Sequence, residues 1–176
     1  VVGGKGINIS LLLKNIGKES KALGFVAGFT GDFIKEELTK QGIKSNFIET
    51  EGFTRINIKL TTDTETEINS QSSKVNRTNI LDFFSSLDEL TSEDTVFLSG
   101  NIIPGMEDDD FVHIAKKVKE QGANLVVDSN KDMVLHTLKY HPFIVKPNEF
   151  ELGEMFDVHL QSLEDIAIYA KKLQEM

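Results

Sequence analysis

The chain has 176 residues, of which 39% are hydrophobic, and its 19 basic and 28 acidic side chains give a net charge of -9. This length allows one sizeable buried core, and no stretch approaches the roughly 20 consecutive apolar residues of a membrane span. The acidic balance, without any block of Lys or Arg, argues against a nucleic-acid partner. The absence of cysteine excludes disulfides and thiolate chemistry and is compatible with a cytoplasmic location.

The first residues form a glycine-rich loop ahead of a helix. Gly3-Gly4-Lys5-Gly6 precedes apolar residues at helical spacing over residues 6–15, and Gly17 supplies a left-handed stop. A glycine run alone is most often a flexible loop, and this one matches neither the Walker nor the dinucleotide fingerprint. Lys5 and Asn8, at the positive end of the helix, favour an anion site. Val1-Val2 lacks an initiator Met and the layout of a signal peptide, so we expect the chain to begin within a domain.

The next segment predicts a strand, a helix and a second strand. Residues 22–26 are typical of a buried strand, Gly28-Phe29-Thr30-Gly31-Asp32 of a loop, and residues 33–41 of a helix closed by Gly42. A strand over residues 44–49 follows. We therefore expect an α/β core over residues 1–49 that continues at residues 71–176.

Between those parts the pattern changes to that of a β-hairpin. From Thr54 to Leu60 the residues alternate strictly, which places Ile56, Ile58 and Leu60 on one face of a half-exposed strand and Arg55, Asn57 and Lys59 on the other. A turn at Thr62-Asp63 leads to a partner strand over residues 65–69, so residues 50–70 are predicted to form a small lid. Arg55 belongs either to an ordinary solvated edge strand or to a lid that holds a phosphate bidentately.

The remainder repeats an alternation of helix and strand. A polar linker over residues 70–79 precedes helices over 80–90, 108–121 and 132–139, and each helix leads to a strand; these strands end at Ser99, Asp128 and Lys146. Helices over 149–156 and 163–173 close the chain. This alternation predicts a parallel sheet with right-handed crossovers, whose carboxyl edge carries the ligand crevice.

Polar side chains cluster where these strands end. Asp128 directly follows Leu125-Val126-Val127, and Glu151 lies three residues after Asn148. Carboxylates in such places either cap the next helix or hold Mg²⁺ through water. The four histidines share no spacing that indicates a metal site, so we interpret them as structural or surface residues.

Taken in order, several motifs resemble those of the ribokinase-like carbohydrate kinases of the PfkB family. They are Gly-Gly-Lys-Gly-Ile-Asn at 3–8, Thr54-Arg55-Ile56-Asn57, Ser99-Gly100-Asn101 with Pro104-Gly105, Val127-Asp128-Ser129, and the segment 145–151. The resemblance spans essentially the whole chain. It implies a three-layer α/β/α fold with a mostly parallel sheet and a β lid that commonly serves as a dimer contact.

The resemblance also implies a reaction and a role for each motif. The reaction is ATP- and Mg²⁺-dependent phosphorylation of a sugar phosphate, with fructose 1-phosphate or tagatose 6-phosphate as acceptor. The residues implied to bind the sugar phosphate are Gly4, Lys5, Asn8, Arg55 and Asn101, and relatives often have Ser where this chain has Asn101. Lys146 and Asn148 are implied to face the ATP phosphates, and Asp128 and Glu151 to organise hydrated Mg²⁺.

One motif of the family does not occur in the chain. The Gly-Ala-Gly-Asp tetrapeptide, which carries the catalytic base and the anion hole, is absent, and the resemblance implies that it lies beyond Met176. We therefore expect the chain to be a fragment that lacks both termini, contains no catalytic base and is inactive on its own. A non-catalytic module that senses a sugar phosphate is the alternative from another functional class. A nicotinamide dehydrogenase is disfavoured, because no glycine fingerprint follows a strand.

Overall fold

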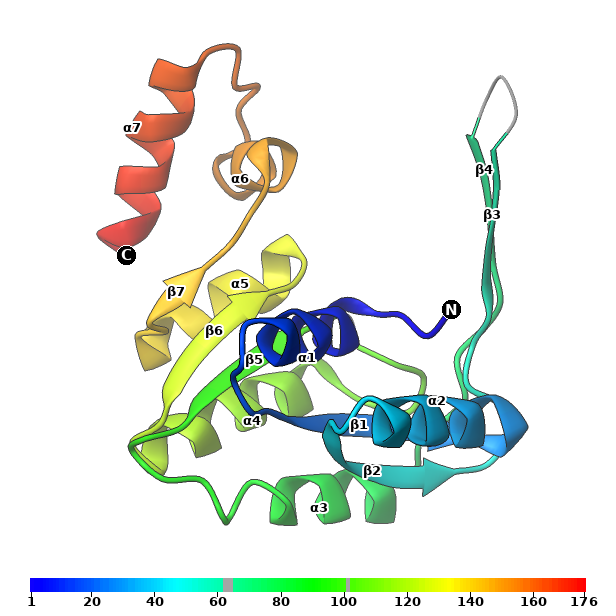
Figure 1. The fold of residues 1–176 in the computed structure, drawn as a ribbon. Coiled ribbons are helices and arrows are strands. Elements are labelled where there is room, and N and C mark those ends of the chain that lie inside the picture. The colour runs from blue at the N-terminus through cyan, green and yellow to red at the C-terminus, as the bar shows by residue number, and fades with distance from the viewer. Residues whose placement is uncertain (62–64, 101) are drawn as a thin grey trace. The chain divides into compact units, whose positions relative to one another are not determined.

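The computed structural model describes residues 1–61, 65–100 and 102–176. They form helices and parallel strands together with one antiparallel hairpin (Figure 1). The α/β class expected from the sequence is thereby confirmed. The chain divides into two compact units, residues 1–86 with 102–106, and residues 87–101 with 107–176.

The first unit is built on a pair of parallel strands, β1 and β2, in which Lys21 lies opposite Lys44. Its elements are α1 (Lys5–Asn15), β1 (Lys21–Ala27), α2 (Gly28–Lys40), β2 (Lys44–Thr50), β3 (Asn57–Thr61), β4 (Glu65–Asn69) and α3 (Arg77–Ser85). A buried cluster of Ala22, Leu38 and Ile43 joins α1 and α2 to one face of the strand pair. The ring of Phe25 stacks at 5.2 Å on that of Phe83, which lies on α3. Alternation along β1 places Ala22 and Phe25 on opposite faces, so helices cover both faces of this pair.

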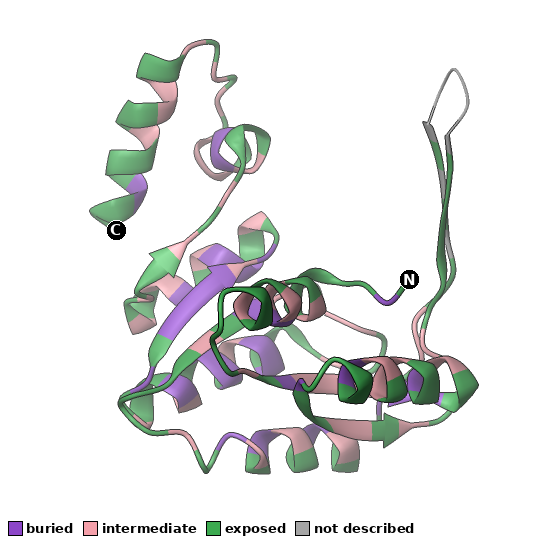
Figure 2. Cartoon of the chain, in the orientation of Figure 1, coloured by how far each residue is buried: buried purple, intermediate pink, exposed green. Residues whose placement is uncertain are grey.

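The hairpin of β3 and β4 leaves both of its faces open. Ile58 lies opposite Ile68 in the antiparallel pair, and the predicted turn at Thr62-Asp63 lies outside the described residues. Ile56, Ile58, Leu60 and Ile68 are 53–56% exposed, and Figure 2 shows the hairpin as a largely exposed ribbon. The prediction of a half-exposed strand that starts at Thr54 was therefore wrong on two points. The strand β3 starts at Asn57, and its apolar residues are exposed like the polar Asn57 and Lys59. The two strands pack mainly on one another, and Thr54 is bonded to β1 instead.

The starts of two helices, α2 and α3, also differ from the prediction. The predicted loop over residues 28–32 is the first part of α2, which begins directly after β1 at Gly28, whose φ of 57° suits glycine. Helix α3 begins at Arg77 and not at residue 80. The side chains of Asn76 and Asn79 form a reciprocal capping box that starts this helix inside the predicted linker.

The second unit contains a parallel sheet of order β5-β6-β7, as predicted from the strand–helix alternation. Its elements are β5 (Thr95–Ser99), α4 (Asp108–Glu120), β6 (Asn124–Asp128), α5 (Lys131–Thr137), the 3-10 helix η1 (Leu138–Tyr140), β7 (Ile144–Val145), α6 (Glu149–Phe156) and α7 (Leu163–Gln174). The central strand β6 is buried along residues 125–127 (Figure 2). Val118 of α4 and Val134 of α5 are fully buried in the same unit. Among the described residues, no helix has the length and apolar character needed to cross a membrane.

Candidate functional site

The glycine-rich loop leads into α1 as predicted. Gly4 is the N-cap of this helix with a φ of 113°, and a glycine has no side chain with which to cap it. The first turn holds no acidic residue, whereas α4 carries three aspartates in its first turn. Lys5 and Asn8 both lie exposed in the first part of α1. Backbone N–H groups that lack an intrahelical acceptor, beside an ammonium group, create a local preference for an anion.

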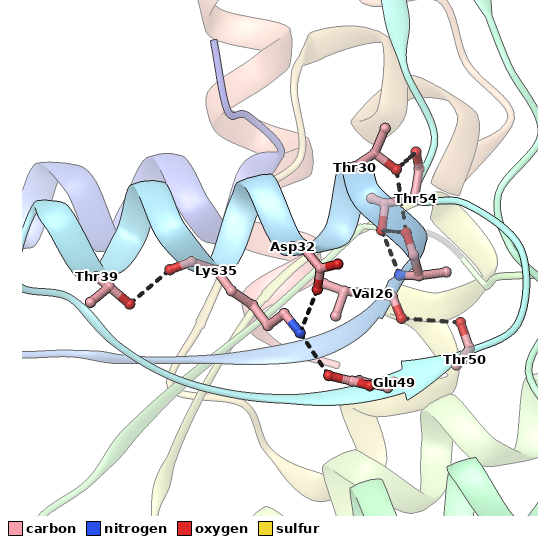
Figure 3. A network of polar contacts seen from close by, with 9 residues as sticks. Val26, Thr30, Asp32, Lys35, Thr39, Glu49, Thr50 and Thr54 are labelled. Carbon is pink, nitrogen blue, oxygen red and sulfur yellow. Dashed lines mark hydrogen bonds and ion pairs between the residues drawn. The ribbon is translucent and has the colours of Figure 1, made fainter.

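Arg55 is exposed and lies in the segment between β2 and the first hairpin strand, β3. The residue before it, Thr54, is bonded to β1 by its backbone and its side chain: the Thr54 N–H donates to the Ala27 carbonyl at 2.9 Å, and the Ala27 N–H donates to Thr54 Oγ1 at 2.8 Å (Figure 3). The chain therefore reaches Arg55 from a fixed point at the strand end.

In the second unit, polar groups meet at the carboxyl edge of the sheet. Ser99 and Asp128 are paired in register at the ends of β5 and β6, and Lys146 follows β7. The Lys146 ammonium lies 3.3 Å from the Asp128 carboxylate, which is only 14% exposed. Buried Ser129 donates a 2.6 Å hydrogen bond to the carbonyl of Gly100, which has a φ of 99°. Three strand ends thus bring a carboxylate, an ammonium and a glycine turn together.

Asn148 and Glu151 form the N-terminal cap of α6. The Glu151 N–H donates to Asn148 Oδ1, and the Asn148 N–H donates to Glu151 Oε2, both at 2.8 Å. The capping interpretation that competed with metal binding is thus realised for Glu151. It is not realised for Asp128, because Asn130 caps α5 by accepting from the Met133 N–H at 3.1 Å.

A metal ion held directly by several side chains does not fit this edge. In the described part of the chain, no three His, Cys, Asp or Glu side chains gather closely enough to ligate a cation. A hydrated Mg²⁺ makes a smaller demand, since that ion usually keeps several waters and takes few protein carboxylates, and Asp128 offers one carboxylate at this edge.

Two of the expected site features lie outside the described residues. Asn101, expected to bind the sugar phosphate, is one of them. The other is the catalytic base, which was expected beyond Met176, the residue that follows the last turn of α7. Both assignments therefore stay predictions.

Sequence reasoning missed the groups that hold these loops in place. Ser129 acts through a hydrogen bond to Gly100, 29 positions away, and Thr54 through hydrogen bonds to Ala27, 27 positions away, and to Thr30. The only sequence signal for either was membership in a motif: Ser129 in Val127-Asp128-Ser129 and Thr54 in Thr54-Arg55-Ile56-Asn57.

Comparisons with known proteins agree over most or all of the chain. The model of the pfkB family carbohydrate kinases matches residues 1–176. A 1-phosphofructokinase from Bacillus subtilis is 43% identical over 173 residues, which are 98% of this chain and 57% of that protein. A D-tagatose-1-phosphate kinase from Bacillus licheniformis is 35% identical over 87% of this chain and 50% of its own length. The crystal structure of a Staphylococcus aureus protein assigned as a phosphofructokinase superposes with a TM-score of 0.85 at 41% identity, covering 98% of this chain and 56% of that one.

Proposed function

The chain belongs to the pfkB family of carbohydrate kinases, and from this we propose that its complete polypeptide transfers the γ-phosphoryl group of ATP to fructose 1-phosphate, giving fructose 1,6-bisphosphate. The observation that carries the proposal is the 43% identity to a 1-phosphofructokinase across nearly all of the chain. The chain spans about 57% of the length of that relative, so the proposal concerns the polypeptide from the complete reading frame.

In this proposal the glycine loop and the lid bind the sugar phosphate. Gly4 and the first turn of α1 supply backbone N–H donors, and Lys5 and Asn8 supply a cation and a side-chain amide. The Arg55 guanidinium supplies a planar fork that holds two phosphate oxygens. From the family resemblance, Asn101 is also proposed to donate to the sugar phosphate. Together these groups offset the net charge of -9, which on its own repels an anionic ligand.

The sheet edge of the second unit is proposed to serve the nucleotide. Lys146 and Asn148 face the ATP phosphates, and Asp128 and Glu151 hold Mg²⁺ through its waters. A bound Mg²⁺ would neutralise charge on the transferring phosphoryl group. The salt bridge from Lys146 orients the Asp128 carboxylate. These residues therefore act by positioning and by charge, which is most of what phosphoryl transfer requires of a protein.

A tagatose phosphate is the alternative acceptor. The tagatose kinase among the relatives is named for the 1-phosphate, so the two relatives share a ketohexose phosphorylated at C1. Fructose and tagatose differ in the configuration of one hydroxyl. A comparison of kcat/KM for fructose 1-phosphate, tagatose 1-phosphate and tagatose 6-phosphate separates these acceptors.

The decisive experiment is a coupled ADP-release assay on the complete polypeptide with fructose 1-phosphate. We expect turnover that requires both ATP and Mg²⁺. A non-catalytic sensor would instead show no ADP release and would bind the sugar phosphate fully without nucleotide in calorimetry. Absence of turnover together with nucleotide-independent binding would overturn the kinase proposal in favour of the sensor.

We also propose that the complete polypeptide forms a homodimer through its lid. Ile56, Ile58, Leu60 and Ile68 are each more than half exposed on one hairpin. Directly opposed residues of an antiparallel pair share a face, so Ile58 and Ile68 belong to one apolar surface. Burying such a surface against a second copy removes its apolar area from water.

A further inference from the structure

The base of the lid is tied to the end of β1 by a group of hydrogen bonds that joins three segments. Thr54 exchanges bonds with Ala27 through its backbone N–H and its hydroxyl, as described above. In addition, Thr30 Oγ1, in the first turn of α2, donates to the Thr54 carbonyl at 2.8 Å (Figure 3). Thr54 thus has its N–H, hydroxyl and carbonyl all engaged, immediately before Arg55.

Two glycines allow this close approach. A Cβ at Gly28 would lie 2.6 Å from the Gly52 carbonyl oxygen, and one at Gly31 would lie 2.9 Å from Val26 Cβ and 3.2 Å from Thr54 Oγ1. Residues 52–54 therefore pack directly on the first turn of α2. This contact explains the motif Gly28-Phe29-Thr30-Gly31, which none of the proposed ligand contacts uses.

The return strand of the lid is secured by separate bonds. The Ile56 N–H donates to Ser70 Oγ at 2.9 Å, and Thr50 Oγ1 donates to Ser73 Oγ at 3.1 Å. The first bond ties the two ends of the hairpin to each other, and the second ties the segments that flank it. Arg55 lies between the Thr54 bonds and the Ile56 bond, in the short segment that both sets restrain.

We propose that Thr54, supported by Thr30, is a positioning residue that presents Arg55 to the phosphate of the acceptor sugar. The inference rests on the proposed function, in which Arg55 binds that phosphate. A guanidinium binds two phosphate oxygens only when its planar fork is correctly placed, and a displacement of about 1 Å at such a group can cost a factor of about 100. Restraint of the backbone on both sides of Arg55 reduces the entropy lost when the phosphate is bound.

The kinetic test compares Thr54→Val with two matched variants in the complete polypeptide. Valine keeps the shape of threonine but removes the acceptor of the Ala27 N–H. We expect KM for the sugar phosphate to rise about tenfold while kcat and KM for ATP stay within about twofold, because binding and not chemistry is disturbed. Thr54→Ser keeps the hydroxyl and should restore KM. Thr39→Val, which removes the exposed Thr39 hydroxyl bonded to the Lys35 carbonyl at 2.8 Å on the same helix, should leave every parameter unchanged.

A second measurement tests the anchor without any activity. Trypsin cleaves after Arg55, and cleavage needs local opening of the chain on both sides of that bond. We expect Thr54→Val and Thr30→Val to accelerate cleavage at Arg55–Ile56 severalfold relative to cleavage at Lys40–Gln41 in the same digest. Thr39→Val and Thr54→Ser should digest as the wild type does.

The outcomes separate this inference from the proposed function. If the wild type has no fructose 1-phosphate kinase activity, the proposed function fails and the presentation of Arg55 to phosphate fails with it, whatever the digestion shows. If the kinase is active and Arg55→Ala raises KM but Thr54→Val does not, the inference is overturned while the function stands. The inference would also be overturned if Thr54→Val lowered kcat/KM equally for both substrates and had a thermal midpoint well below that of Thr39→Val. Those results would show a merely structural role for Thr54.

Discussion

At the scale of single residues, Arg55 offers the sharpest test of the sugar-phosphate half of the proposed site. Its side chain is exposed, so Arg55→Ala should change binding more than folding. Loss of a charged hydrogen-bonding partner costs about 1.5–3 kcal/mol, which corresponds to a ten- to hundredfold fall in kcat/KM for fructose 1-phosphate. Steady-state kinetics on the complete polypeptide measure this directly. The kcat/KM of Arg55→Lys should lie between those of the wild type and Arg55→Ala, because lysine keeps the charge but lacks the planar fork of the guanidinium. An unchanged kcat/KM in Arg55→Ala would show that Arg55 is not part of the site.

The exposed pair of Glu19 and Lys44, 2.8 Å apart, gives a pH dependence with a definite sign. The hydrogen bond from Lys44 lowers the pKa of Glu19 below 4.5, and the same bond raises the pKa of Lys44 above 10.5. The contribution of Glu19 to the free energy of unfolding is therefore present above pH 4.5 and is lost as the pH falls through the lowered pKa of the folded state. The contribution of Lys44 is present below pH 10.5 and is lost as the pH rises through the raised pKa of the folded state.

We accordingly expect Glu19→Gln to lower the free energy of unfolding slightly at neutral pH and not at all at either extreme. Urea titrations of wild type and variant across the pH range measure the difference. A salt concentration of about 1 M should reduce the difference in the free energy of unfolding at neutral pH, because salt screens exposed charges. A difference that persists unchanged well below pH 4.5 would show that Glu19 stabilises the fold by packing and not through its charge.

The sequence pattern predicted where certain side chains lie, but not which groups they bond to. Asp128 and Lys146 lie where the strand ends predicted, because alternation and strand length alone determine which residues reach the edge of a parallel sheet. The capping bonds of Asn148 and the tie from Thr54 to Ala27 depend on which atoms meet in space. Sequence reasoning left helix capping by the carboxylates open as an alternative, and its only signal for Thr54 was membership in a motif.

At the scale of elements, periodicity identified nearly every helix and strand, and α6 was confirmed at both ends. The start of α3 is set by the local capping box of Asn76 and Asn79, whereas the start of α2 depends on a tertiary contact. Residues 28–32 contain two glycines and were interpreted as a loop, yet they are helical because the base of the lid packs on them. Glycine has a low helix propensity, and here the packing contact outweighs it.

The hairpin provides the prediction that belongs to this scale. Ile58→Asp places a charge in the apolar surface proposed to bury itself in a dimer, so we expect the complete polypeptide to become monomeric, as measured by sedimentation velocity. Asn57→Asp adds the same charge on the opposite face of β3 and should leave the dimer intact. A dimer that survives Ile58→Asp, or a wild type that is already monomeric, contradicts dimerisation through the lid.

At the scale of the whole molecule, the two compact units have different proposed tasks. The unit that contains residues 1–86 carries the residues proposed to hold the sugar phosphate, apart from Asn101. The unit that contains residues 107–176 carries all those proposed for ATP and Mg²⁺. Phosphoryl transfer needs both sets and a base that deprotonates the accepting hydroxyl. Within the family resemblance, that base belongs to the Gly-Ala-Gly-Asp motif, which the chain lacks.

The 176-residue chain and the complete polypeptide should therefore differ in turnover far more than in binding. We expect the chain alone to show negligible ADP release with fructose 1-phosphate, because general base catalysis contributes about 10²–10⁴-fold and the anion hole adds to it. The same coupled assay on both proteins measures the ratio of their turnover, and calorimetry with fructose 1-phosphate shows whether the chain retains binding. Robust turnover by the chain alone would place the catalytic base among its own carboxylates and not beyond Met176, with Asp128 and Glu151 as the first to be substituted.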